Sequence, residues 1–309
     1  MKRFWYFGIV CLTLTACLQK NLPPAPSSGM LPINGTRLYY EVIGEGEPVV
    51  VLHGGPGMNY AYLMPYFETL ADEHQMVLFD RRACGRSEAI VDSGSIRMDT
   101  LVADIEALRI ALGLERIHLM GHSWGGLLAM WYAKTYPDHL QSMILLNPNP
   151  PNKYFQDSIN TRILAREPTE HRELLRNWYY SPEYQNGEQK AIENTYRLSF
   201  QYQLYNQRLL DSINFYIPGD QRDRTSQFRS MYQDLREYDL TDSLAGFTQP
   251  TLIIHGEYEY TPLAAFARLD SMLEDAELVD LPYCGHFAYL EAPEQFKRVV
   301  KQFLRKNRM

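Results

Sequence analysis

The sequence predicts an α/β fold in which a mostly parallel, doubly wound sheet carries an inserted helical region. Short apolar runs, such as 48–52 and 251–254, have the composition of strands buried on both faces. Amphipathic stretches of helical length follow most of these runs, which is the alternation typical of a parallel sheet covered by helices. The alternation stops between residues 152 and 245 and then resumes, which indicates an insertion.

The individual elements follow from periodicity. Residues 36–42 alternate between apolar and polar side chains, as expected of a half-exposed strand. Further strands are predicted at 48–52, 76–79, 117–120, 141–146, 251–254 and 276–281. Helices are predicted at 60–71, 100–112, 127–133, 263–273 and 293–306. We therefore assign the two segments 33–150 and 246–309 to one sheet-based core.

The inserted segment, 151–245, has no run of buried-strand character, and ten of the chain's 22 tyrosines lie in it. We predict a helical lid over the sheet, with helices near 155–166, 169–179, 187–204 and 222–236. Tyrosine combines an apolar body with a polar tip and is common in pocket walls. A loosely packed helical surface is the alternative interpretation.

The N-terminus has the pattern of an export signal. Lys2 and Arg3 precede an apolar run that is too short to span a bilayer comfortably, and the run ends in Leu-Thr-Ala-Cys17. This ending resembles the bacterial lipobox. It implies a signal peptide over 1–16, a lipid on Cys17, a flexible tether over 17–32 and a protein anchored to a membrane of the bacterial cell envelope. A plain secretory signal with an incidental cysteine is the alternative.

Charge and cysteine content exclude some classes of function. The formal net charge is −7, and we find no basic stripe, so the sequence gives no case for nucleic-acid binding. None of His53, His122 and His255 has metal-ligand spacing with another His, Asp or Glu, so the sequence gives no support for metal binding. Outside the signal and Cys17, only Cys84 and Cys284 remain, and they are expected as buried thiols lining the pocket or, alternatively, as a disulfide. The oligomeric state is left open.

The most informative stretch is Gly-His-Ser-Trp-Gly-Gly, residues 121–126, between an apolar run and an amphipathic helix. A G-x-S-x-G turn in this context holds Ser123 on a sharp elbow with its hydroxyl exposed. The glycines two residues to either side leave room for that turn. A chance motif in a glycine-rich turn is the alternative, but the strand and the helix stand where a nucleophile requires them.

A serine nucleophile needs a base and a carboxylate that orients the base. In a doubly wound sheet these partners come from loops at the carboxyl ends of later strands. Glu259 follows one predicted strand end by five residues, and His286 follows the last by five. We predict Ser123, Glu259 and His286 as a triad, with Asp242 and Asp280 as less fitting acids. His53, His122 and His255 are interpreted as structural.

Acyl transfer also needs donors for the oxyanion that forms on the substrate. One is expected to be the backbone N–H of Trp124, directly after the nucleophile. The other is expected from the turn His-Gly-Gly-Pro-Gly, residues 53–57, most plausibly from Gly55. Glycine there lets the backbone approach a substrate closely, although a simple tight turn would explain it too.

With these motifs assembled, residues 33–306 resemble the α/β-hydrolase fold and, within it, the proline iminopeptidase family of serine peptidases. The motifs that carry the resemblance are 53–57, 80–87 (Asp-Arg-Arg-Ala-Cys-Gly-Arg-Ser), 121–126 and Cys-Gly-His286. The resemblance implies a cofactor-free enzyme that releases an N-terminal residue, often proline, from short peptides. It assigns Ser123, Glu259 and His286 as the triad.

Two positions depart from the family pattern. The family's acid is usually aspartate, whereas Glu259 stands at that position, with one more methylene group. Some relatives carry a glutamate directly after the acid to bind the substrate's ammonium, whereas this chain has Tyr260. The lid offers other carboxylates, among which the sequence does not choose: Glu167, Glu170, Glu173, Glu183, Glu188, Glu193 and Glu237.

The leading hypothesis is therefore a lipid-anchored serine exopeptidase that acts on small peptides. An esterase, amidase or lactonase that uses the same triad on another small acyl substrate is the second hypothesis. A catalytically silent binding lipoprotein that kept the fold is the third.

Overall fold

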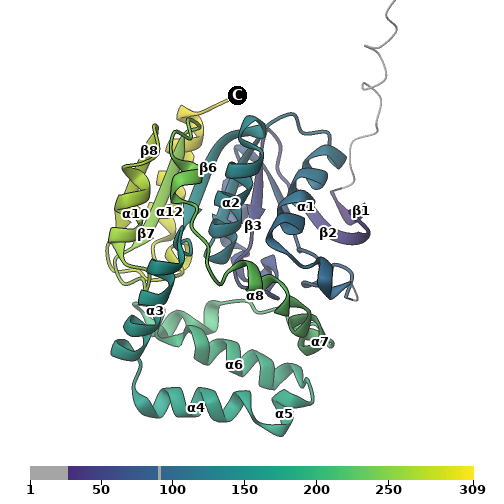
Figure 1. Ribbon diagram of the computed structural model, residues 1–309, viewed down its shortest axis with the longest axis vertical. Coiled ribbons are helices and arrows are strands. Elements are labelled where there is room, and N and C mark those ends of the chain that lie inside the picture. The colour runs from purple at the N-terminus through teal and green to yellow at the C-terminus, as the bar shows by residue number, and fades with distance from the viewer. Residues whose placement is uncertain (1–26, 90–91) are drawn as a thin grey trace, which may run out of the picture.

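A computed structural model describes residues 27–89 and 92–309 of the chain. The predicted signal peptide and Cys17 lie outside the described residues. Eight strands form one sheet in the order β1-β2-β4-β3-β5-β6-β7-β8, and Figure 1 shows it running from β1 and β2 on the right to β8 on the left. The strands are β1 (Ser28–Ile33), β2 (Thr36–Ile43), β3 (Glu47–Leu52), β4 (His74–Phe79), β5 (Ile117–His122), β6 (Leu140–Leu146), β7 (Thr251–Gly256) and β8 (Ala276–Leu281).

From β4 to β8 every neighbouring pair of strands is parallel, while β1 and β2 are antiparallel additions at one edge. Strand β1 corrects one expectation, because residues 28–32 were assigned to a flexible tether. Ser28 to Ile33 pair with Glu41 to Thr36 along the whole strand. Gly29 and Pro32 concealed the strand in the sequence, and proline is tolerated there because β1 lies at the edge of the sheet.

Both faces of the sheet are buried. In β3, Val50 and Leu52 pack into one apolar cluster and Val49 and Val51 into the other, as the two-residue period of a strand requires. The first cluster contains residues of α1 (Met98–Ala111), α2 (Trp124–Thr135) and α10 (Leu263–Asp270). The second contains residues of α11 (Ala288–Glu291) and α12 (Pro293–Lys306).

The helix predicted at 60–71 is not present as one continuous α-helix. The chain forms two short 3₁₀ turns there, η1 (Tyr60–Leu63) and η2 (Tyr66–Leu70). Pro65 stands between them, and proline has no N–H to continue a helical hydrogen-bond ladder. Four further 3₁₀ turns are η3 (Ser93–Ser95), η4 (Pro137–His139), η5 (Gln207–Ser212) and η6 (Gln227–Arg229).

The inserted segment is helical and lies below the sheet in the view of Figure 1. Its helices are α3 (Lys153–Arg166), α4 (Thr169–Tyr179), α5 (Pro182–Gln185), α6 (Gln189–Gln201), α7 (Gln221–Ser226), α8 (Met231–Asp234) and α9 (Thr241–Leu244). The long helix predicted at 222–236 is divided into α7, a 3₁₀ turn and α8. Over the described ranges, no helix has the length and apolar character needed to cross a membrane.

Candidate active site

Ser123 occupies a strained turn between β5 and α2. Its backbone angles are φ 58° and ψ −124°, in the left-handed half of φ that a non-glycine residue rarely adopts. The flanking glycines are sterically required. A Cβ on Gly121 would lie 2.3 Å from the carbonyl oxygen of Gly125, and one on Gly125 would lie 2.2 Å from that of Leu52. The turn therefore holds the serine out from the sheet with its hydroxyl facing a cavity.

That cavity, the active cavity below, has a volume of about 230 Å³. It lies between the carboxyl ends of the strands and the lid. Its lining residues include every residue that the sequence singled out for catalysis, together with lid side chains: Gly55, Pro56, Ser123, Trp124, Asn149, Gln156, Ile159, Ile163, Phe200, Gln203, Glu259, Tyr260, Thr261 and His286. The Oγ of Ser123 donates to Asn149 Oδ1 at 3.5 Å, a long contact.

Glu259 and His286 form a short, buried pair. His286 Nδ1 lies 2.6 Å from Glu259 Oε2, which is the geometry of an N–H donated to the carboxylate. Burial by itself raises the pKa of Glu259, but the charge and hydrogen bond of His286 and the backbone N–H of Tyr260 outweigh it, so the pKa falls to about 2. Glu259 therefore stays ionised and can hold the imidazole in one orientation.

The extra methylene of Glu259, compared with aspartate, is accommodated by local hydrogen bonds. Oε1 accepts the N–H of Tyr260 at 2.6 Å, and Oε2 accepts the amide of Asn147 at 3.2 Å. Asn147 also donates to the carbonyl of Gly285. Asn147 was not predicted as a site residue, because its place at the end of β6 is the only feature of the sequence that points to it. Neither alternative acid lines the active cavity, and Asp280 instead binds His255 at 2.8 Å.

Two backbone N–H groups at the cavity, those of Gly55 and Trp124, have no acceptor among the described hydrogen bonds. Gly55 has φ 54°, a conformation that glycine adopts without strain. The two groups flank Ser123 from different elements, the β3 turn and the start of α2. Free N–H groups in this arrangement can bind an oxyanion.

The buried guanidinium of Arg81 supports the glycine turn, residues 53–57. Arg81 donates to the carbonyls of His53, Gly54 and Gly55, the last at 2.9 Å, and its charge lies 4.6 Å from the centre of the Trp124 ring. It is almost fully buried, and its contacts span both elements that present free N–H groups. In the sequence, the Asp-Arg-Arg motif indicates only a resemblance to a family. The role of Arg81 could not be predicted, because nothing local shows which carbonyls it contacts.

A second network joins the glycine turn to the histidine loop. The N–H of Gly54 donates to the Tyr62 hydroxyl at 2.6 Å, and that hydroxyl lies 2.6 Å from His122 Nδ1. His122 Nε2 lies 2.8 Å from the carbonyl of His286. Burial and the nearby charge of His286 lower the pKa of His122 to about 3, so it is neutral at pH 7. The geometry then has Tyr62 donating to Nδ1 and Nε2–H donating to the carbonyl.

The lid is attached to the loops that carry the candidate catalytic residues. Arg166 donates to the carbonyls of Tyr258 and Glu259. The carbonyl of Gln203 accepts the backbone N–H of His286 at 2.9 Å.

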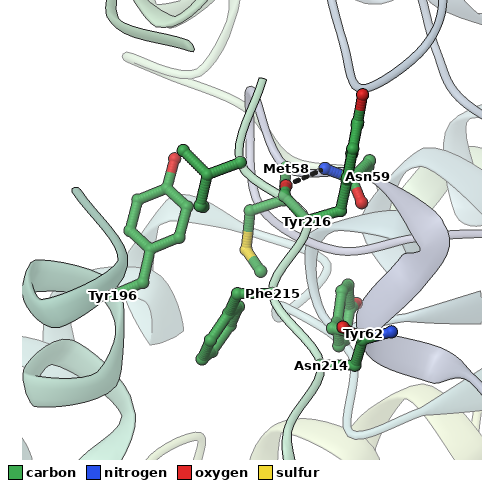
Figure 2. Close-up of a pocket in the computed structure, with 8 residues that line it drawn as sticks. Met58, Asn59, Tyr62, Tyr196, Asn214, Phe215 and Tyr216 are labelled. Carbon is green, nitrogen blue, oxygen red and sulfur yellow. Dashed lines mark hydrogen bonds between the residues drawn. The ribbon is translucent and has the colours of Figure 1, made fainter. Parts of the chain in front are cut away.

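The lid also reaches the glycine turn, where Gln221 of α7 donates to the carbonyl of Gly57 at 2.8 Å. Figure 2 shows the Asn59 amide bonded to the carbonyl of Tyr216, at 2.8 Å, beside a small cavity of about 10 Å³ that Met58 and Phe215 also line. Contacts to the catalytic loops and to the glycine turn therefore hold the lid over the cavity.

The described lid offers few carboxylates for a substrate ammonium. Among the described residues, Glu259 is the one carboxylate that lines the active cavity, and it is already bonded to His286. Of the seven lid glutamates, Glu167 comes nearest, since it is buried and accepts the Tyr260 hydroxyl at 3.1 Å. Apart from Ser123, Glu259 and His286, the polar side chains of the lining are neutral: Trp124, Asn149, Gln156, Gln203, Tyr260 and Thr261.

Both core cysteines are free and buried. Cys84 and Cys284 belong to the apolar clusters on opposite faces of the sheet, and neither lines the active cavity, which corrects the expectation of pocket thiols. Burial raises the pKa of Cys84 to about 11 and that of Cys284 to about 12. Within residues 27–89 and 92–309, no group of three or more His, Cys, Asp or Glu side chains is placed to hold a metal ion.

The fold and the site together define a class of protein. Residues 47–293 match the family described as the alpha/beta hydrolase fold, which covers most of the chain, so this protein belongs to that family and is a hydrolase. Within the family it is similar to proline iminopeptidases, as the sequence motifs implied.

A proline iminopeptidase of Thermoplasma volcanium is 29% identical over 300 residues, covering 90% of this chain and 97% of the relative. One from Lactobacillus helveticus is 27% identical over 302 residues, covering 89% and 97%. A crystal structure of a proline iminopeptidase-related protein from Thermus thermophilus is 26% identical, with a TM-score of 0.68, and covers 91% of this chain and 97% of that one.

Proposed function

We propose that the protein is a serine exopeptidase that releases an N-terminal residue, plausibly proline, from short peptides through Ser123, His286 and Glu259. The observation that carries the proposal is the 2.6 Å contact between His286 and an ionised, buried Glu259 at the cavity that Ser123 faces. The names of the relatives support a peptide substrate.

In this mechanism His286 acts as general base towards the hydroxyl of Ser123, which attacks the carbonyl carbon of the scissile bond. The hydroxyl first leaves its 3.5 Å contact with Asn149 by rotating about its Cα–Cβ bond. Catalytic hydrogen bonds are often long before substrate binds. Glu259 keeps the imidazole oriented and stabilises its positive charge.

The negative charge that develops on the carbonyl oxygen is accepted by the N–H groups of Gly55 and Trp124. His286 then gives its proton to the departing amine, which leaves the N-terminal residue as an ester on Ser123. A water molecule, deprotonated by the same histidine, attacks that ester and releases the free amino acid. No cofactor takes part in any of these steps.

A second candidate, an esterase or amidase that uses the same residues, is favoured by one observation. Apart from Glu259, no carboxylate within residues 27–89 and 92–309 lines the active cavity. An α-ammonium bound there would be received by the oxygens of neutral amides such as Gln203, and neutral acceptors bind a cation more weakly than a carboxylate does. An uncharged acyl group meets no such difficulty.

Four substrates separate the candidates: prolyl, alanyl and N-acetyl-prolyl arylamides and an aryl acetate, each tested beside Ser123→Ala. Cleavage of the free-amine prolyl substrate that is lost on acetylation and in the variant supports the exopeptidase. Ser123-dependent ester turnover without arylamide turnover supports the esterase. A protein that cleaves none of them and does not react with a fluorophosphonate is the silent binding protein.

We also propose that the mature chain is attached to the bacterial cell envelope by a lipid on Cys17. The support is the Leu-Thr-Ala-Cys sequence after a basic and apolar leader. In a bacterial host, the wild-type chain is expected to incorporate labelled palmitate and to sediment with membranes. Cys17→Ala is expected to incorporate none. Equal labelling of the two chains contradicts the anchor.

A further inference from the structure

A second cavity opens beside the active cavity. Its volume is about 390 Å³, and four residues line both cavities: Pro56, Trp124, Asn149 and Gln156. We call it the side cavity. Its other lining residues come from α2, from the lid and from the segment around α8: Leu127, Lys153, Tyr232, Leu235, Arg236 and Tyr238. Because they share these four residues, the two cavities lie next to each other.

The charge of the side cavity is opposite to that of the chain. The protein has a formal net charge of −7, yet no Asp or Glu in the described part of the chain lines the side cavity, while Lys153 and Arg236 do. Asp157 pairs with Lys153. Among the described contacts, the guanidinium of Arg236 has no hydrogen-bond or ion-pair partner. Arg236 lies near the active cavity, because it lines the side cavity next to it.

The same sign of charge continues outwards. Tyr232 also lines a third cavity, of about 630 Å³, on the lid. Arg222 and Arg229 line this cavity too, and no carboxylate of the described residues does. Neither arginine has an ion pair among the described residues. Cations on the walls of neighbouring cavities, of which only Lys153 has an ion pair among the described residues, attract an anion and repel a cation.

Trp124 supplies an independent observation. The residue is 3% exposed and lines both the active cavity and the side cavity, yet its indole Nε1–H has no acceptor among the described residues. Buried donors in folded proteins are nearly always paired. An unpaired donor on a residue that lines a cavity is available to an oxygen of a bound molecule once the indole turns towards it.

We propose that the side cavity binds the leaving-group end of the substrate and that Arg236 pairs with the free terminal carboxylate of that end. This inference rests on the proposed exopeptidase function and narrows it to short peptides with an ionised C-terminus. An extended residue spans about 3.5 Å, so a carboxylate one or two residues beyond the scissile bond leaves the active cavity for its neighbour. The indole N–H of Trp124 meets a carbonyl or carboxylate oxygen on the way.

The test compares two arylamides that differ only in charge, prolyl-4-aminobenzoate and prolyl-4-aminobenzamide. The wild-type protein is expected to prefer the carboxylate by roughly 10-fold in kcat/KM, the scale of a charge-assisted hydrogen bond. In Arg236→Gln the ratio between the two substrates is expected to fall to about 1–2. Arg236→Lys, which keeps the charge, is expected to retain part of the preference. Added salt is expected to weaken it, because Arg236 is exposed.

Arg268→Gln is the matched control, because Arg268 is an exposed arginine on α10 that lines none of these cavities. It removes the same charge from the protein, and its substrate ratio is expected to equal that of the wild type. Equal turnover of the two arylamides by the wild type overturns the inference and leaves the exopeptidase function standing. A preference that survives in Arg236→Gln overturns it as well.

A measurement that needs no peptidase activity separates the inference from the function on which it rests. The two leaving groups, 4-aminobenzoate and 4-aminobenzamide, are compared for protection of Ser123 against a fluorophosphonate. Stronger protection by the carboxylate, lost in Arg236→Gln, supports the carboxylate site even when no arylamide is cleaved. Failure of arylamide cleavage alone then counts against the exopeptidase, and equal protection counts against the side cavity.

Discussion

The sheet and the lid contribute to the active cavity in different ways. Ser123, Glu259 and His286 stand one, three and five residues beyond the ends of parallel strands. Helix α2, which follows Ser123, has nine of its 12 residues buried, whereas α3, which opens the lid, has 14 residues and none buried. The strand ends are thus fixed by backbone ladders and a packed core, while α3 has no buried residue and meets the core partly through the hydrogen bonds of Arg166.

This contrast implies a division of labour. Substitutions at the strand ends should change the rate of the chemical step, and substitutions in the lid should change substrate preference with little cost in stability. The same contrast explains why the type of reaction is easier to predict from the sequence than the substrate is. The predictions below test the division, beginning with the strand-end residue for which we expect the largest effect.

Glu259→Gln should cause the largest loss. An amide cannot stabilise the charged imidazole and permits the wrong tautomer of His286, so kcat is expected to fall by about 10³–10⁴-fold with KM little changed. Glu259→Asp, which restores the charge on a shorter side chain, should recover part of the activity. Steady-state kinetics on a prolyl arylamide or an aryl ester check both variants. A loss below about 10-fold in Glu259→Gln would assign the acid's role to another group.

Arg81→Lys tests whether the support beneath the glycine turn matters to the reaction. A lysine cannot contact the carbonyls of His53, Gly54 and Gly55 together, so the Gly55 N–H should lose its fixed position. We expect kcat to fall by about 10–100-fold, somewhat less than removal of an oxyanion donor.

The matched control for Arg81→Lys is Arg82→Lys. Arg82 is an equally buried neighbour that pairs with Asp104 at 2.6 Å, away from the cavity. Arg82→Lys should lower the free energy of unfolding by about 1–3 kcal/mol without changing kcat in the folded protein. Urea unfolding and single-turnover acylation separate stability from rate. Equal rate losses in the two variants would show that Arg81 acts only through stability.

Much of the core could be predicted because local signals agree with the final structure there. Apolar runs marked the buried strands, and residue spacing from their ends led to the three side chains that line one cavity. The failures have physical causes. Gly29 and Pro32 hid an edge strand, and Pro65 divided a predicted helix into two 3₁₀ turns. At Pro65 the proline prevented the helix that the apolar pattern predicts, whereas β1 formed in spite of its glycine and proline.

The supporting groups of the site could not be predicted, because their contacts join distant parts of the chain. Asn147 reaches Glu259 across 112 positions, and Tyr62 reaches His122 across 60. No local periodicity reports such pairs. The lid is the extreme case: the sequence named seven glutamates as candidates for binding an ammonium, and the described cavity is lined by none of them. Recognition is set by tertiary packing rather than by motif.

The pH dependence of stability should reveal the buried pair at the strand ends. The pKa of Glu259 in the folded state, about 2, lies below its ordinary value of 4.5. The stabilisation from the ionised carboxylate is therefore complete above pH 4.5 and is lost as pH falls towards 2, by up to about 3 kcal/mol. Urea midpoints measured between pH 6 and 2.5 should fall more steeply for the wild type than for Glu259→Gln. Parallel curves would contradict this prediction.

The smallest effect is expected where the lid meets the core. Arg166 donates to the carbonyls of Tyr258 and Glu259, and in Arg166→Gln both bonds are lost while the acid keeps its bond to His286. We expect kcat/KM to fall by about 3–10-fold, mostly through KM, because a loosened lid holds substrate less well. Arg176→Gln, on the exposed side of α4, is the control and should match the wild type. A fall in kcat as large as that of Glu259→Gln would mean that the lid positions Glu259 itself. In that case the strand ends alone would not set the rate of the chemical step, and the lid would do more than select the substrate.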